Sequence, residues 1–158
     1  MATDDYTKAK AVYDTVREAL IENGWKFQEN EESLQVSATA IGEDLPMEIT
    51  LTADAERQLL VVFSRLPISV PADVRIDLAV AVCFINNNMV DGCFDYDVED
   101  GKIFFRLTSS FIDSEIGKEA VMYMVLCSCG TIDKYNDKLM MLSKGTLTVE
   151  QFLASEME

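Results

Sequence analysis

The side chains that most often perform chemistry in proteins are scarce in this sequence. The chain contains no histidine, which excludes the commonest general base, the Ser-His and Cys-His dyads and the usual zinc ligand. No expected strand is followed by a Gly-x-Gly-x-x-Gly or Walker-type loop, so no backbone cradle for a nucleotide phosphate is predicted. We therefore expect no catalytic residue, no cofactor and no enzymatic activity.

One acidic segment could in principle bind calcium. Asp95 and Asp97 precede a glycine at position 101, but the sixth position counted from Asp95 is Asp100 and the twelfth is Arg106. A calcium loop of the EF-hand type needs glycine and glutamate at those positions. The segment is therefore interpreted as a β-hairpin, in which the carboxylates alternate along a strand.

The four cysteines are the other candidate metal ligands. Cys127 and Cys129 are two residues apart on an expected helix, so they point in nearly opposite directions. Together with Cys83 and Cys93 they are expected to be buried structural thiols, and no metal site is predicted. A zinc or redox role is the alternative.

Composition narrows the choice of partner. The 158 residues include 28 acidic and 13 basic side chains, which give a formal net charge of -15. Such a charge repels phosphate backbones and anionic lipids, so neither nucleic acid nor a membrane surface is expected as a partner. It suits a basic or amphipathic protein partner, or serves only to maintain solubility.

The hydrophobic content predicts a complete core in one domain covering residues 1–158. Apolar residues make up 49% of the chain and charged residues 26%, a balance typical of globular proteins. The N-terminal residues lack the apolar region of a signal peptide, and the longest apolar runs are too short to cross a bilayer. A cytoplasmic location is expected.

Hydrophobic periodicity and turn residues predict an α+β fold in the order α-β-β-β-β-α-β-β-α, with an antiparallel four-strand meander followed by a hairpin and helices packed on the sheet. The long third helix has a possible break at Gly130, and Thr148 with Gln151 has the spacing of a capping box for a short last helix. The predicted elements are a helix at 4–23, strands at 25–29, 33–40, 47–53 and 58–65, a helix at 71–87, strands at 93–98 and 102–108, and a helix from 113 or 114 to about 142.

Two apolar patterns bear on binding. Residues 34–39 and 47–52 alternate between apolar and polar or small side chains, so one sheet face should be buried and the other in contact with water. Residues 59–63 are apolar without alternation, which indicates a strand at the centre of the sheet or beneath a partner.

Residues 120–127 are apolar on all sides of the expected long helix. Such a segment either lies deep in the core or reaches into a dimer interface or a partner's groove. We take Met122, Tyr123 and Met124 as candidate partner-binding residues and expect a homodimer.

The order of elements and one motif resemble a known bacterial family. The motif runs from the asparagines of residues 85–89 through the glycine and acidic strand of 92–97 to the Asp-Gly turn and strand of 100–106. It resembles the YbjN-like family of sensory transduction regulators, whose fold is similar to that of type III secretion chaperones. The resemblance implies a dimeric domain that holds an amphipathic segment of a client protein, but it identifies no catalytic or client-binding residue.

The sequence thus predicts a non-enzymatic, chaperone-like or regulatory protein-binding module. Two alternatives remain at this stage. One is a structural homodimer without a client, and the other is an enzyme that uses carboxylates or Cys93.

Overall fold

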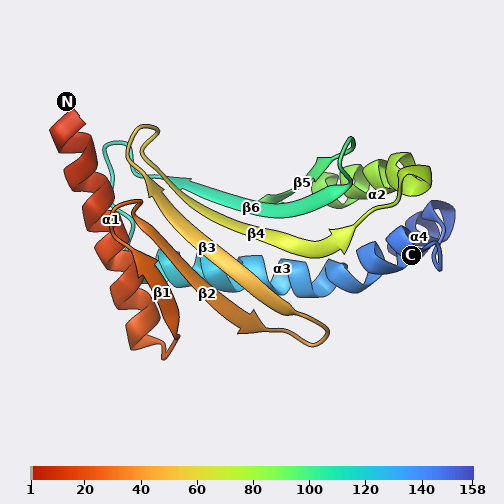
Figure 1. Ribbon diagram of the computed structural model, residues 1–158, viewed down its shortest axis with the longest axis horizontal. Helices are drawn as coiled ribbons and strands as arrows, with labels where there is room; N and C mark the ends of the chain where they lie inside the picture. The colour runs from red at the N-terminus through yellow and green to blue at the C-terminus, as the bar shows by residue number, and fades with distance from the viewer. Residues whose placement is uncertain (1) are drawn as a thin grey trace.

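The computed structural model describes residues 2–158 and contains one six-stranded antiparallel sheet with helices packed against it (Figure 1). The long helix α3 runs along the sheet and α1 crosses one end of it. The elements are α1 (Ala2–Glu22), β1 (Phe27–Asn30), β2 (Gln35–Ile41), β3 (Pro46–Asp54), β4 (Leu59–Ser69), a short 3-10 helix η1 (Ala72–Val74), α2 (Arg75–Asn87), β5 (Cys93–Asp97), β6 (Lys102–Ser110), α3 (Lys118–Lys144) and α4 (Val149–Glu156).

The strand order across the sheet is β1-β2-β3-β4-β6-β5. The first four strands form the predicted meander, and the excursion through α2 returns the chain so that β6 pairs with β4 while β5 forms the far edge. The predicted α+β fold class and element order are therefore confirmed. The strand that contains residues 59–63, β4, lies inside the sheet as its unbroken apolar pattern indicated.

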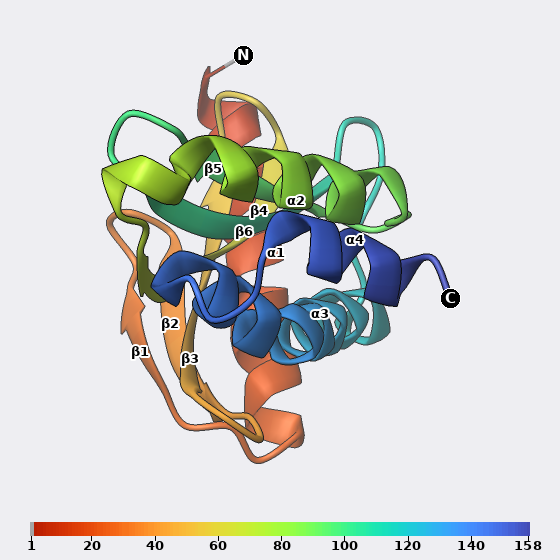
Figure 2. The ribbon, with the colours of Figure 1, turned by 90° about the vertical axis from the view of Figure 1, so that its right-hand side faces the viewer.

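Helices cover one face of the sheet. Both α1 and α3 contact the strands, and Figure 2 shows α3 to one side of β1, β2 and β3. The core lies between this covered face and the two helices, as the alternation along β2 and β3 predicts. It includes Val36, Ile49, Leu60 and Phe105 from the sheet and Val16, Leu20, Val125 and Leu139 from the helices.

The start of α3 differs from the prediction. The helix begins at Lys118, after Gly117 in an extended conformation, and not at residue 113 or 114. Asp113 has a φ of 49°, which no right-handed helix accommodates. Phe111 and Ile116 are both buried, so the segment that connects β6 in the sheet to the helix α3 packs against the core.

Gly130 does not break α3. The helix continues through it to Lys144, and a Cβ atom added at this position would meet nothing within 4 Å. The predicted break was wrong because packing of the flanking turns onto the sheet outweighs the local cost of a glycine, about 1 kcal/mol relative to alanine. The helix ends instead at Gly145, whose φ of 75° places it in the left-handed region.

The short helix α4 begins as predicted. The backbone N-H of Gln151 donates to the Thr148 hydroxyl oxygen at 3.1 Å, and the Thr148 N-H donates to the Gln151 side chain at 3.0 Å. These reciprocal bonds form a capping box and satisfy two donors that the first helical turn leaves free.

The sheet splits between β3 and β4. Their pairing covers Thr50 to Asp54 with Leu59 to Phe63 and then stops, although both strands continue. Continued along both strands, this register would place Pro46 opposite Pro67. Neither proline has a backbone N-H to donate, so the ladder could not continue through this pair. Figure 1 shows β3 and β4 adjacent at one end and apart at the other.

Candidate binding surface

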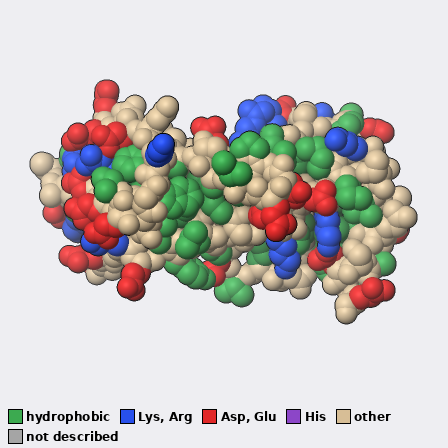
Figure 3. Space-filling view, turned by 90° about the horizontal axis from the view of Figure 1, so that it is seen from below, with side chains coloured by type: hydrophobic (Ala, Val, Ile, Leu, Met, Phe, Trp, Pro, Cys, Tyr) green, Lys and Arg blue, Asp and Glu red, His purple; other side chains and the backbone are tan. Residues whose placement is uncertain are grey.

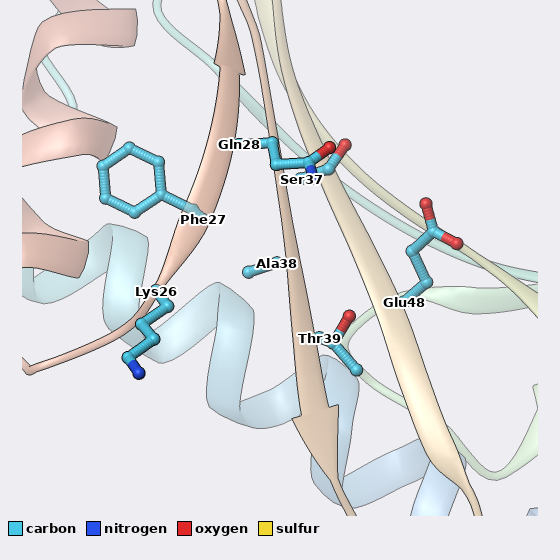
Figure 4. Close-up of a pocket in the computed structure, with 7 residues that line it drawn as sticks. All are labelled: Lys26, Phe27, Gln28, Ser37, Ala38, Thr39 and Glu48. Carbon is cyan, nitrogen blue, oxygen red and sulfur yellow. The ribbon is translucent and has the colours of Figure 1, made fainter.

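A hollow of about 480 Å³ lies beside β1, β2 and β3 (Figure 4). Phe27 points toward α1, whereas Gln28, Ser37 and Glu48 lie on the other side of the strands. Active sites bring several polar groups together around one reacting atom. The hollow has no such convergence, so it is a gap beside a short edge strand and not a catalytic cleft.

The face of the sheet opposite α1 and α3 carries a pair of aromatic rings. Phe63 on β4 and Phe104 on β6 are stacked, with ring centroids 5.1 Å apart and an interplanar angle of 28°. The register explains the contact, because Phe63 pairs with Arg106 and Arg65 pairs with Phe104, which makes the two rings diagonal neighbours. Phe63 remains 37% exposed. We call this side of the sheet the open face.

Polar side chains surround the two rings on the β3 side. Thr50 is the cross-strand partner of Phe63, and Thr52 is the partner of Val61. Thr50 also lies within hydrogen-bonding distance of Ser37, with the two hydroxyl oxygens 3.3 Å apart. The aromatic pair therefore stands in a largely polar surface, which is the usual surrounding of an interface centre.

Charged groups flank the rings on the β5 side. The Arg106 guanidinium binds the Asp95 carboxylate through two contacts, from Nε at 2.9 Å and from Nη2 at 3.1 Å. The hydrogen bond with Asp95 raises the pKa of Arg106 above its usual value. This two-point contact holds the charged Arg106 side chain beside Phe104, which lies two residues before it on β6.

Cys93 lies next to this ion pair, with its Sγ 3.7 Å from Arg106 Nη2. Burial raises the pKa of the Cys93 thiol the most, and the negative charge of Asp95 raises it further. A catalytic cysteine requires the reverse, a lowered pKa that favours the thiolate. The structure therefore gives no support to the alternative in which Cys93 is a nucleophile.

The cysteines are less buried than the sequence indicated. Cys83 is exposed, because Leu78, Ala81, Val82 and Ile85 form the inner face of α2 and Cys83 points away from it. The other three thiols are partly buried and free. Within residues 2–158, no cluster of three or more cysteine or acidic side chains is arranged to hold a metal ion.

The structure separates the three candidate residues on α3. Tyr123 is 58% exposed and its hydroxyl donates to the Asp91 carboxylate. Met122 is partly buried, and Met124 is only 4% exposed because it faces the sheet. The hydrogen bond with Asp91 raises the pKa of Tyr123. Of the three, Tyr123 alone offers a large accessible side chain.

Tyr123 belongs to an apolar stripe along the outer side of α3. Ala120, Tyr123, Leu126 and Gly130 are all exposed and recur at helical spacing. Viewed from below, the molecule shows hydrophobic side chains gathered left of centre, beside an end rich in Asp and Glu (Figure 3). A second possible contact surface thus lies away from the open face of the sheet.

The β5 edge of the sheet is closed by an asparagine side chain. The Asn86 Nδ2 donates to the Phe94 carbonyl oxygen at 2.9 Å, and the Phe94 N-H donates to Asn86 Oδ1 at 2.8 Å. The amide therefore occupies the outward hydrogen-bonding groups in the middle of β5, where another strand would otherwise pair. Asn86 belongs to the asparagine motif of the sequence, and this contact gives that motif a structural role.

Comparison with known proteins identifies the family. The YbjN family model, described as "Putative bacterial sensory transduction regulator", matches residues 13–140. The chain belongs to the YbjN family. A search of curated proteins gives no match.

Two solved structures have a similar fold. YbjN from E. coli, described as "a putative transcription regulator", superposes with a TM-score of 0.56 at 15% identity, over 85% of this chain and 92% of that one. A chain of the ExsC-ExsE complex superposes with a TM-score of 0.57 at 17% identity, over 82% and 94%. At these identities the likeness establishes the fold and leaves the partners to be determined.

Proposed function

We propose that this member of the YbjN family is a non-enzymatic, chaperone-like or regulatory module that binds an amphipathic segment of a partner protein on the open face of its sheet. The observation that carries this proposal is the partly exposed Phe63–Phe104 stack in an otherwise polar surface. Aromatic and arginine side chains at the centre of a polar surface are typical of the residues that contribute most to protein binding.

The neighbours of the stack favour burial of an apolar side chain. Val61 precedes Phe63 by two residues on β4, so both face the same side, and Val61 is partly buried. Arg65 on the same side is exposed. A partner residue placed over the rings would bury apolar surface at about 25 cal/mol per Å² and exclude water from the flanking arginines.

The charge of the whole molecule favours a basic partner. A formal charge of -15 attracts cationic segments over roughly 8 to 10 Å at physiological ionic strength. Long-range attraction of this kind accelerates association more than it strengthens the final complex. Raised salt is therefore expected to slow binding more than it speeds dissociation.

The family and the fold agree with this proposal. The family description refers to sensory transduction regulation, and the similar ExsC-ExsE structure is a complex named for two proteins. Within residues 2–158, no helix is long and apolar enough to cross a membrane. The cytoplasmic location stays a prediction from the sequence.

We also propose a homodimer formed through the outer stripe of α3, with Tyr123 and Leu126 at its centre. Both side chains are 58% exposed on a helix whose opposite side packs on the sheet. A stable dimer buries at least about 1,000 Å² in total, which this stripe reaches only together with neighbouring residues. The same surface supports the alternative of a structural homodimer without a client.

Purification of the native protein followed by mass spectrometry tests the proposed binding. A co-purified polypeptide is synthesised as a peptide, and its affinity is measured by calorimetry for the wild type and for Phe104→Ser. The substitution is expected to cost about 2 kcal/mol, or roughly thirtyfold in Kd. Tyr6→Ser is the matched control, because it removes an exposed aromatic ring from α1, outside both proposed surfaces. Equal loss in both variants, or loss in Tyr6→Ser alone, contradicts binding on the open face.

A further inference from the structure

The split between β3 and β4 exposes two strand edges to each other. In the described part of the chain, β3 from Pro46 to Ile49 pairs only with β2, and β4 from Ser64 onward has lost its β3 partner. The β4–β6 register is also interrupted between Arg65 and Ser69. Strand edges present backbone N-H and C=O groups at regular spacing, which another extended segment can pair with.

A buried polar side chain lies at the base of this split. Asn136 of α3 is 1% exposed, and among residues 2–158 neither its amide nitrogen nor its amide oxygen has a hydrogen-bond partner. It lines a hollow of about 10 Å³ bounded by Pro46 and Met47 on one arm and by Leu66 and Pro67 on the other. An unpartnered buried amide is costly, since its desolvation is not compensated. Such a group is satisfied either by a water molecule in the hollow or by a polar group of a binding partner.

We propose that an extended segment of the partner polypeptide enters the split as an additional strand and that a small hydroxyl side chain of this segment, serine or threonine, hydrogen-bonds the Asn136 amide. One hydroxyl can donate to Oδ1 and accept from Nδ2, so it satisfies both atoms. The inference builds on the proposed protein binding and adds to it the conformation and the specificity of the segment.

Another asparagine of the structure already makes the proposed pair of hydrogen bonds, and the hollow limits the size of the side chain that can reach Asn136. The Asn86 amide already makes a donor and an acceptor bond at once, with the backbone of Phe94. The hollow at Asn136 holds about one water-sized group, which suits a hydroxyl and excludes a long polar side chain. Charges of both signs lie near this hollow: Arg65 lines it, and Glu48 is exposed on the part of β3 that has lost its β4 partner. A lysine on the outward side of the inserted strand would complement Glu48.

The test uses two peptides with blocked termini that differ only in one group, a hydroxyl in the first and a methyl in the second. The first has the sequence Val-Lys-Val-Lys-Thr-Lys-Val-Lys-Val, which as a strand places the lysines outward and the central threonine toward α3. In the second, valine replaces the threonine. We expect the threonine peptide to bind the wild type at least about tenfold more tightly, and we expect this difference to vanish in Asn136→Leu, as a direct contact requires.

Hydrogen exchange identifies the location of binding. The threonine peptide is expected to slow exchange of the amides in residues 47–49 of β3 and 64–68 of β4 in the wild-type protein, which keeps the test valid if Asn136→Leu does not fold. Equal affinities of the two peptides, no binding at all, or protection confined to β1 overturns the inference. Those results leave the proposed function intact, because it depends on Phe104 and is tested with the natural partner.

Discussion

Replacing Asn86 with alanine tests the structural role of the asparagine motif. The variant loses two hydrogen bonds to the backbone of Phe94, of 2.9 and 2.8 Å, each contributing about 1 kcal/mol to stability. Alanine is the better helix former by about 0.5 kcal/mol at this position near the end of α2, so the net loss is about 1.5 kcal/mol. For a chain of this length, that loss lowers Tm by roughly 3 to 6 °C.

The matched control is Asn88→Ala. Asn88 makes one exposed side-chain bond, to the Phe84 carbonyl oxygen at 2.9 Å, so its removal is expected to cost about 0.5 kcal/mol or less. Urea unfolding of the three proteins gives both values, and exchange of the Phe94 amide should quicken only in Asn86→Ala. A loss in Asn86→Ala no larger than that in Asn88→Ala would refute the assigned role of the clamp.

Three further predictions concern helix α3, the cysteines and the dimer. Gly130→Ala should stabilise the protein by about 0.5 to 1 kcal/mol in urea unfolding. Gly145→Ala, at a φ of 75°, should destabilise it by about 1 kcal/mol. A change in the free energy of unfolding that has the same sign for both variants would contradict the backbone argument. At pH 8, iodoacetamide should label the exposed Cys83 faster than Cys93 or Cys129. Burial raises the pKa of Cys93 and Cys129, which lowers the fraction of each that is thiolate. Mass spectrometry of digests measures the order of labelling, and the reverse order would contradict this prediction. Sedimentation should give a dimer for the wild type and a monomer for Leu126→Asp, while a monomeric wild type at high micromolar concentration contradicts the proposed interface.

Local signals predicted the elements well. Thr148 and Gln151 are three residues apart and form the capping box that their spacing indicates. The alternation in residues 47–52 correctly predicted which side of β3 is buried. Such features depend on neighbours within one turn or one strand, so the sequence alone contains them.

Features that depend on distant packing were missed or only partly predicted. The turn at Asp113 reflects the burial of Phe111, which a helical pattern does not reveal. Phe63 and Phe104 meet through the β4–β6 register, and that pairing requires the crossover through α2. Asn136 looks like any polar residue of a long helix until the split places it beneath two strands. A count of strand positions on one face could have indicated Phe63 and Phe104 once the pairing was known.

The most direct test of the central claim is photo-crosslinking in cells from the open face. A benzophenone amino acid replaces Val61, which lies on the same face of β4 as Phe63, and in a second protein it replaces Thr7, which is exposed on α1. We predict a covalent adduct with a partner polypeptide from position 61 and none from position 7, and we predict that Phe104→Ser weakens the adduct. Adducts of equal yield from both positions, or from position 7 alone, would contradict binding on the open face.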